Sequence, residues 1–216
     1  MESKYLNMYE SPYHFRVNQP EIESTPGIYL MIHGWSGNEN SMSIFESTIP
    51  NNSLLISPRG NLKISDNQYG WINPNNHEEN EFELYKKNAI NLFQPTRNII
   101  HQLTNSDNQK INLIGFSQGS TICIVLSVLF PDFFSKIALL SGYLPKNFPT
   151  SINNGLNNIQ FYISHGTKDT VVDYAKAIEI EGLLRDSGAD VELCTSEVAH
   201  KVSSDCLKNL KYFFND

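Results

Sequence analysis

The chain contains six short, mostly apolar runs that are separated by polar and glycine-rich segments. An apolar run of this length is typical of a strand buried on both faces of a sheet. The runs occupy residues 28–32, 54–57, 111–114, 136–140, 159–164 and 190–194. We therefore predict six core strands.

Between these runs, apolar residues recur at the spacing of an amphipathic helix. The helical segments predicted in this way are 40–47, 81–103, 118–130, 174–187 and 203–214. Pro95 lies inside the longest segment, and we expect the helix to break near it. Gly188 suits a C-terminal stop, and Ser203 or Ser204 suits an N-cap.

Strands that alternate with helices indicate a mostly parallel sheet whose right-handed crossovers place helices on both faces. Residues 13–17 alternate weakly, which favours an edge strand. Segments 61–79 and 146–158 are predicted loops, too short to form a large cap domain. Because no repeat or linker is visible, we predict a single α/β domain over residues 1–216.

The charge of the chain narrows the classes of function. The net charge is −7 and no long basic run occurs, which argues against nucleic acid and anionic membranes as partners. Residues 1–7 lack the apolar segment of a secretory signal, and no apolar run approaches the length of a membrane span. We interpret an acidic group near the start of the long helix as a solvated face rather than a metal site. This group comprises Glu78, Glu79, Glu81 and Glu83.

The cysteines are few and widely spaced. Cys123, Cys194 and Cys206 include no C-x-x-C pair. An odd, sparse set favours reduced thiols that pack as small hydrophobic side chains. We therefore expect a cytoplasmic protein.

The pattern G-x-S-x-G occupies Gly115 to Gly119, between a predicted strand and a predicted helix. This is the signature of a nucleophile elbow, a sharp turn that raises a serine out of the sheet. A serine hydroxyl is a weak nucleophile until a neighbouring base activates it. We therefore predict Ser117 as a nucleophile, with the N-terminal N–H groups of the following helix facing the reaction site.

A candidate acid and a candidate base follow the next predicted strands. Asp169 follows the strand 159–164, and His200 follows the strand 190–194. The order Ser, Asp, His is the triad order of the α/β-hydrolase fold, and ligands of open α/β sheets bind at the carboxyl ends of the strands. We predict His200 as the general base and Asp169 as its partner. Asp173 is the competing acid, which we interpret as a helix cap.

The remaining histidines are predicted to have other roles. His33 and His165 each precede a glycine at a strand end, and we expect them to form local hydrogen bonds that fix the loops. His14 and His77 are expected on the surface, and His101 on the solvated side of the long helix.

Two backbone N–H groups are predicted to form an oxyanion hole. One belongs to Gln118, directly after the nucleophile, and the other to Trp35, in the loop after the first buried strand. The side chains of Trp35 and Trp71 either line an acyl pocket or belong to the core. No His, Asp or Glu set shows metal-ligand spacing, so no metal is expected.

The chain resembles the phospholipase/carboxylesterase branch of the α/β hydrolases, which includes the acyl-protein thioesterases. The matching segments run in the family's order, from about residue 28 to the end of the chain. They are 30–37, 58–60, Trp71, 115–119, 141–145, 165–172 and 199–200. The resemblance implies the α/β-hydrolase fold, the triad Ser117, Asp169 and His200, Trp35 and Gln118 as oxyanion donors, and esterase activity without a cofactor.

The chain departs from the family pattern at three places. Ser120 stands where the family usually has glycine, and Leu113-Ile114 replaces a glycine-rich approach to the elbow. Asn38 follows Gly37 where the family has an aspartate. Because of these departures, the resemblance does not predict the shape of the acyl pocket.

We therefore predict a serine hydrolase that cleaves carboxylic esters or thioesters through an acyl-enzyme, with a small-molecule or lipid-type acyl ester as substrate. One alternative is a peptidase or amide hydrolase of the same fold, and another is a ligand-binding sensor on a hydrolase scaffold. The sequence does not set the acyl chain length or the oligomeric state.

Overall fold

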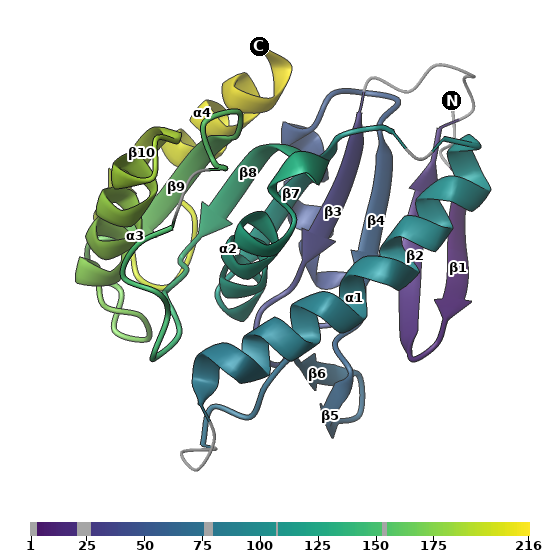
Figure 1. Ribbon diagram of the computed structural model, residues 1–216, viewed down its shortest axis with the longest axis horizontal. Helices are drawn as coiled ribbons and strands as arrows, with labels where there is room; N and C mark the ends of the chain where they lie inside the picture. Colours follow the sequence, from purple (N-terminus) through teal and green to yellow (C-terminus); the bar gives the residue numbers. More distant parts are fainter. Residues whose placement is uncertain (1–3, 21–26, 76–79, 107, 153–154) are drawn as a thin grey trace.

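A computed structural model describes residues 4–20, 27–75, 80–106, 108–152 and 155–216 of the chain. These residues form an eight-stranded sheet in the order β1-β2-β4-β3-β7-β8-β9-β10 (Figure 1). The strands are β1 (Lys4–Glu10), β2 (Tyr13–Gln19), β3 (Ile28–Ile32), β4 (Leu54–Pro58), β7 (Ile111–Phe116), β8 (Phe134–Leu140), β9 (Gln160–Gly166) and β10 (Asp190–Ser196). From β4 to β10 every neighbouring pair is parallel, and β1 and β2 are antiparallel additions at one edge. The predicted α/β fold is confirmed.

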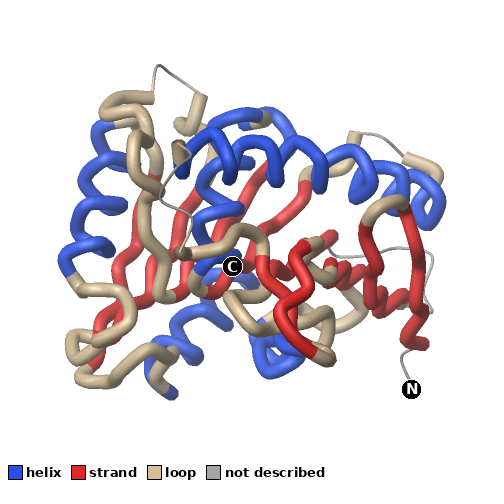
Figure 2. The backbone as a smooth tube through the Cα atoms, turned by 90° about the horizontal axis from the view of Figure 1, so that it is seen from below, coloured by secondary structure: helices blue, strands red, loops and turns tan. Residues whose placement is uncertain are grey.

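Helices cover both faces of the sheet, as Figure 1 and Figure 2 show. The helices are α1 (Glu81–Thr104), α2 (Gln118–Leu129), α3 (Ala175–Asp186) and α4 (Ser204–Asn215), with the short 3-10 helices η1 (Ser41–Thr48) and η2 (Pro131–Phe133). The first three α-helices pack on one face, and α4 packs with η1 on the other. Within the described residues, no helix is both long enough and apolar enough to cross a membrane.

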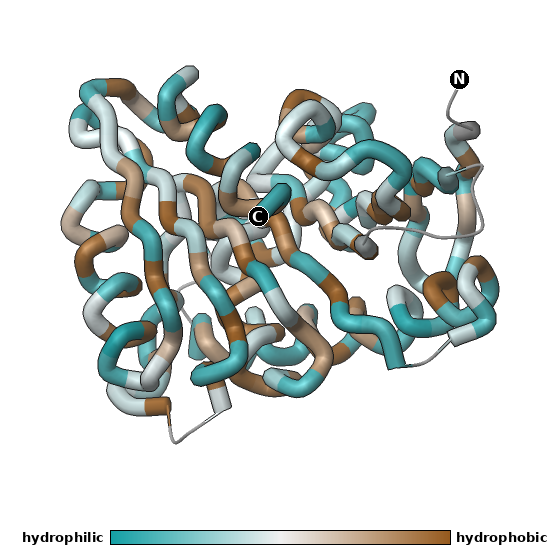
Figure 3. Tube along the Cα trace, turned by 90° about the horizontal axis from the view of Figure 1, so that it is seen from above, coloured by the Kyte–Doolittle hydropathy of each residue, from teal (hydrophilic) through white to brown (hydrophobic). Residues whose placement is uncertain are grey.

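The apolar runs fill two layers of core because successive side chains of a strand point to opposite faces. In β3, Ile28, Leu30 and Ile32 join the cluster beneath α1 to α3, whereas Tyr29 and Met31 join the cluster beneath η1 and α4. Figure 3 shows hydrophobic segments gathered along the central strands. A run without polar positions therefore supplies both layers.

The predicted helix ends agree with the structure. The side chain of Ser203 accepts a hydrogen bond from the N–H of Cys206 at the start of α4. Gly188 follows α3 with a φ of +82°, a conformation that glycine adopts without strain. Asn80, which was not predicted as a cap, accepts from the N–H of Glu83 at the start of α1.

Three predictions about the elements are wrong. Residues 13–17 do not form an edge strand, because β1 pairs with β2 along its whole length. In β1 only Leu6 and Met8 pack against the core, whereas Tyr5, Asn7 and Tyr9 are exposed, so the strand carries no strong apolar signal. The predicted loop 61–79 contains a hairpin of β5 (Leu62–Ser65) and β6 (Gln68–Gly70). Helix α1 continues through Pro95, since Leu92, Thr96 and Ile99 keep its inner face buried.

Part of the predicted acidic group and one histidine, namely His77, Glu78 and Glu79, lie outside the described residues. Glu81 and Glu83 lie in the first turn of α1. The carboxylate of Glu81 accepts a hydrogen bond from the N–H of Lys146, and Glu83 pairs with Lys86. These two acidic side chains therefore have structural partners on the protein surface.

The cysteine prediction is wrong for two of the three thiols. Cys194 in β10 and Cys206 in α4 form a disulfide, whereas Cys123 is free and buried. Sequence spacing could not reveal the pair, because packing of α4 against β10 brings the two cysteines together. The cytoplasmic location rested on reduced thiols, and disulfides persist mainly in oxidising compartments. The cysteines therefore no longer support that prediction.

We predict that reducing the Cys194–Cys206 bond lowers the free energy of unfolding by about 2–4 kcal/mol, because the unfolded chain regains the freedom that the cross-link removes. Denaturant titration with and without a dithiol reductant measures this change. The double variant Cys194→Ala/Cys206→Ala should show no effect of the reductant. Detection of three free thiols in unfolded, unreduced protein would contradict the disulfide.

Candidate active site

Ser117 lies at the sharp turn between β7 and α2. Its backbone has φ of 54° and ψ of −119°, a strained conformation for a residue with a side chain. The N–H of Ser117 donates to the carbonyl oxygen of Leu140 in β8, at an N···O distance of 2.8 Å. Ser117 is 8% exposed. The turn therefore has the backbone strain that the predicted nucleophile elbow requires.

The two glycines of the motif allow α2 to approach the sheet closely. A Cβ atom on Gly119 would lie 2.0 Å from the carbonyl oxygen of Ile32 in β3. A Cβ atom on Gly115 would lie 2.4 Å from the carbonyl oxygen of Gly119. Both distances are far below van der Waals contact, so any side chain at either position would displace the helix from the sheet.

Ser120, which departs from the family pattern, connects the elbow to the neighbouring strand β8 by hydrogen bonds. It is fully buried, and its Oγ lies 2.7 Å from the carbonyl oxygen of Gly115 and 2.9 Å from that of Leu140. The same Oγ accepts from the N–H of Leu140. Leu113 and Ile114, the other departure near the elbow, are fully buried in the two core layers. None of these side chains therefore faces an acyl pocket.

Asp169 and His200 come together from the loops after β9 and β10. His200 Nδ1 lies 2.7 Å from Asp169 Oδ2. Two hydrogen bonds tie the loops to each other, from Thr167 N–H to Ser196 O and from Lys168 N–H to Val198 O. The predicted acid and base are thus paired in the structure.

The surroundings of Asp169 keep its carboxylate charged. Burial by itself raises the pKa of Asp169, but hydrogen bonds from the Val172 N–H, the His200 ring and the Val171 N–H outweigh burial and hold the pKa below its ordinary value. The Oδ1 atom accepts from both backbone N–H groups, so Oδ2 is aimed at His200.

The pair lies at the edge of the sheet where the parallel strands end, the edge that faces the viewer in Figure 2. Ser117 follows β7, and the loops of Asp169 and His200 follow β9 and β10. The ring of Phe116, the residue before the nucleophile, lies 5.0 Å from the His200 ring between centroids. The structure therefore brings the three predicted residues to one edge of the sheet.

His165 and the competing acid Asp173 have structural partners. His165 Nε2 lies 2.9 Å from the carbonyl oxygen of Val172, so this buried histidine holds the Asp169 loop as predicted. Asp173 is exposed, and its Oδ1 accepts from the N–H of Ala175 at the start of α3. His14 is exposed, in agreement with its prediction.

The loop after β3 lies directly against the nucleophile. A Cβ atom on Gly34 would lie 3.1 Å from the Ser117 Cβ and 3.1 Å from the Phe116 carbonyl oxygen. Among the described residues, neither the Trp35 N–H nor the Gln118 N–H donates a hydrogen bond. Both predicted oxyanion donors are therefore available beside Ser117.

Trp71 belongs to the core that supports this loop. It is 2% exposed, and its indole Nε1–H donates to the carbonyl oxygen of His33 at 2.8 Å. The Gln118 side chain, whose role the sequence did not suggest, accepts from the Trp71 N–H and donates to the Ile72 carbonyl oxygen. Trp35 is 37% exposed, so of the two tryptophans only Trp35 presents a large open surface.

A partly buried ion pair, which the sequence also did not reveal, borders the loop after β3. Arg59 binds Glu39 through two hydrogen bonds, of 2.6 Å from Nε and 2.5 Å from Nη2. The hydrogen bond from Arg59 holds the pKa of Glu39 below its ordinary value. The guanidinium also lies over the Tyr69 ring, at 4.8 Å from its centroid. The pair thereby links the loop to the β5–β6 hairpin.

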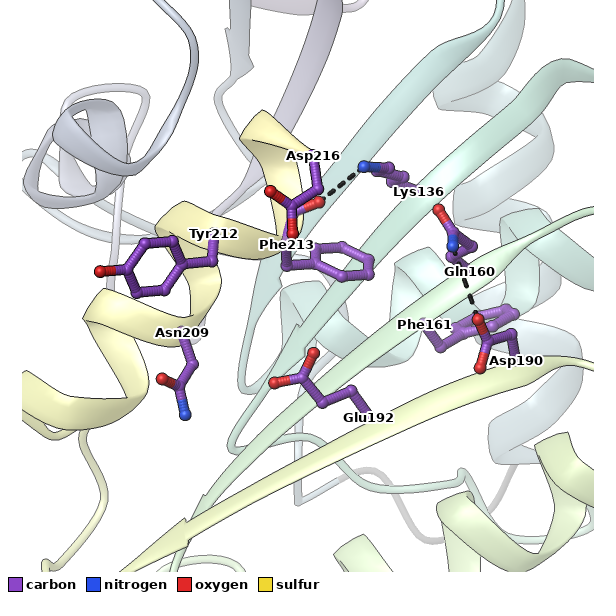
Figure 4. Close-up of a pocket in the computed structure, with 9 residues that line it drawn as sticks. All are labelled: Lys136, Gln160, Phe161, Asp190, Glu192, Asn209, Tyr212, Phe213 and Asp216. Atoms are coloured by element: carbon purple, nitrogen blue, oxygen red, sulfur yellow. Dashed lines mark hydrogen bonds between the residues drawn. The ribbon is translucent and has the colours of Figure 1, made fainter.

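A separate pocket of about 360 Å³ lies at the opposite end of the strands (Figure 4). Its lining includes Lys136, Gln160 and Asp190, which stand at or near the starts of β8, β9 and β10. The pocket of Figure 4 is therefore remote from Ser117, which follows the carboxyl end of β7.

In the part of the chain that the structure describes, no three His, Cys, Asp or Glu side chains gather as a metal site would need.

Comparisons with solved structures identify chains of the same fold at low sequence identity. A carboxylesterase from Bacillus cereus has a TM-score of 0.82 and 18% identity, with 95% of this chain and 94% of that chain covered. A carboxylesterase from Mesorhizobium loti has 0.81 and 16%, with 98% of each chain covered. Acyl-protein thioesterase 2 from Zea mays has 0.70 and 17%, with 93% and 97% covered.

A search of curated proteins finds no match. The model of the phospholipase/carboxylesterase family, by contrast, matches residues 13–216, which include the elbow, the Asp169–His200 pair and the loop after β3. The chain therefore belongs to the phospholipase/carboxylesterase family of α/β hydrolases.

Proposed function

We propose that this protein is a serine hydrolase that cleaves carboxylic esters or thioesters through a Ser117, His200, Asp169 triad and an acyl-enzyme. The observation that carries the proposal is the 2.7 Å pairing of His200 with a buried, charged Asp169 at the same sheet edge as the strained Ser117 elbow. Family membership supports the reaction class, and the whole chain would act as one catalytic domain.

The first half-reaction forms the acyl-enzyme. Ser117 Oγ attacks the carbonyl carbon of the substrate, and His200 Nε2 takes the hydroxyl proton. The tetrahedral intermediate then collapses, the bond to the leaving oxygen or sulfur breaks, and His200 returns the proton to the leaving group. In the second half-reaction, water attacks the acyl-enzyme with His200 as base, which releases the acid and restores Ser117.

Asp169 fixes the tautomer of the base. Its carboxylate accepts the Nδ1–H of His200, which leaves Nε2 free to accept the proton of Ser117. A carboxylate held charged by two backbone N–H groups also stabilises the imidazolium that forms during each proton transfer. The proposed mechanism uses only side chains and backbone groups of the chain itself.

The proposed oxyanion hole consists of the Trp35 and Gln118 N–H groups. Neither has an acceptor among the described residues, and the Trp35 loop lies against Ser117. Donors of this kind stabilise the negative charge that develops on the substrate oxygen. Esters and thioesters develop that charge at the same position, which suits a small-molecule or lipid-type acyl ester as substrate.

The cytoplasmic location stays a prediction.

We predict that Ser117→Ala lowers kcat/KM for p-nitrophenyl esters by at least about 10⁴-fold, because only binding and the oxyanion hole remain to assist water. Initial rates on esters from acetate to palmitate, with wild type and variant side by side, measure this loss. A rate that depends on Ser117 and peaks at one chain length would also give the length of the acyl pocket. A wild-type rate in the variant would overturn the assignment of Ser117.

We predict that Asp169→Asn lowers kcat by on the order of 10⁴-fold with a small change in KM, since an amide can hold the imidazole in the wrong tautomer. The matched control is Asp173→Asn, four positions along the same loop, where the asparagine can still cap α3. The control should keep kcat within about twofold. If the two variants lose kcat equally, Asp169 is not the partner of His200.

A further inference from the structure

One peptide group of the loop after β3 has a defined orientation. The carbonyl oxygen of Gly34 and the N–H of Trp35 belong to the same trans peptide, so they point in opposite directions. Two donors hold that carbonyl oxygen, the Gly37 N–H at 3.2 Å and His33 Nδ1 at 2.7 Å. The Trp35 N–H is therefore turned away from both His33 and Gly37.

His33 can hold this peptide only as one neutral tautomer. The Gly34 carbonyl oxygen can only accept, so Nδ1 carries the proton. The Gly60 N–H can only donate, and it lies 2.9 Å from His33 Nε2, so Nε2 is the acceptor. One imidazole thus connects the loop after β3 with the end of β4.

The packing around His33 keeps the ring neutral and fixed. His33 is 1% exposed, and burial lowers the pKa of its imidazole to about 4. The Trp71 ring lies 5.2 Å from the His33 ring, and its indole N–H donates to the His33 carbonyl oxygen. The charged groups nearby are Glu39 and Arg59, which bind each other.

We propose that His33 is a positioning residue of the oxyanion hole, whose imidazole clamps the Gly34–Trp35 peptide so that the Trp35 N–H faces the carbonyl oxygen of a substrate at Ser117. This inference rests on the proposed function. His33 itself does not touch the substrate, because its ring is buried and both nitrogens are engaged.

The position of Gly37 supports a fitted contact rather than a chance neighbour. A Cβ atom on Gly37 would lie 2.8 Å from His33 Nδ1 and 3.0 Å from its Cβ. The φ of Gly37 is outside the left-handed region, so backbone conformation does not require glycine there. The missing side chain leaves room for the imidazole, and filling that room would displace it.

The test compares two substitutions of His33 that each retain one of its two hydrogen bonds. In His33→Asn the amide nitrogen can replace Nδ1 and still donate to the Gly34 carbonyl oxygen. In His33→Gln the amide can reach the position of Nε2 and accept from the Gly60 N–H, but the donor to Gly34 is lost. A clamp on Gly34 predicts that kcat falls less than about tenfold in Asn and about 10²-fold or more in Gln, the scale of one lost oxyanion donor.

A second readout separates positioning from folding. An alkyl boronic acid forms a tetrahedral adduct with the serine and places an oxygen in the oxyanion hole. Its inhibition constant should rise with the loss of kcat across His33→Asn, His33→Gln and His33→Ala, whereas KM stays within about threefold. A variant that is merely less stable would show, per folded molecule, the kcat and the boronate inhibition constant of the wild type.

Gly37→Ala tests the same contact, between residue 37 and the His33 ring, without changing His33 itself. The added methyl group would push on Nδ1 while leaving His33 in the sequence, so kcat should fall and boronate binding should weaken together. The matched control is His14→Asn on the exposed face of β2, which should leave both unchanged.

The outcomes distinguish this inference from the proposed function. Equal kcat in His33→Asn and His33→Gln, or a folded His33→Ala within threefold of wild type, would overturn the clamp while Ser117-dependent turnover persists. A wild-type protein without Ser117-dependent turnover or boronate binding would overturn the proposed function, and the clamp with it. Circular dichroism of each variant identifies those that fold.

Discussion

The close backbone approach of α2 to the ends of β3 and β7 is the constraint on which the candidate site depends. At position 119 there is no room for a Cβ atom beside the Ile32 carbonyl oxygen, so only glycine fits there. This contact sets where α2 can begin. Ser117 must then turn within one residue, in a strained conformation. Its N–H donates to the Leu140 carbonyl oxygen, and the Ser120 hydroxyl accepts from the Leu140 N–H beside it. Packing of the apolar helix on the sheet supplies the free energy that keeps this strain in place.

Burial disfavours the charged form of both Asp169 and His33, but the two side chains end in opposite charge states. At Asp169, backbone N–H groups and His200 outweigh burial and lower the pKa of the carboxyl, so the carboxylate stays charged. At His33, burial outweighs its partners and lowers the pKa of the imidazole, so the ring stays neutral. A charged partner suits an imidazolium that forms during catalysis, whereas a neutral ring suits a clamp that donates once and accepts once.

Local sequence patterns predicted most of the fold. The six apolar runs became the six parallel strands, Ser203 capped the start of α4, and Gly188 followed the end of α3, as expected. The misses are of two kinds, because β1 and the β5–β6 hairpin depend on pairing with a neighbouring strand, whereas α1 and the disulfide depend on packing between elements. Strand β1 is stabilised by pairing with β2 rather than by its own apolar pattern, and α1 continues through Pro95 because its buried face packs on the sheet.

The sequence by itself determined the fold class, the family and the residues that candidate chemistry requires, since strand-end order and the G-x-S-x-G turn are encoded locally. Only the tertiary structure decided which groups meet. It paired Cys194 with Cys206, placed Trp71 in the core and joined His33 to the Gly34 and Gly60 backbone. These contacts join segments that are separate in the sequence, and their geometry follows from how the helices and strands pack, which no short window of sequence specifies.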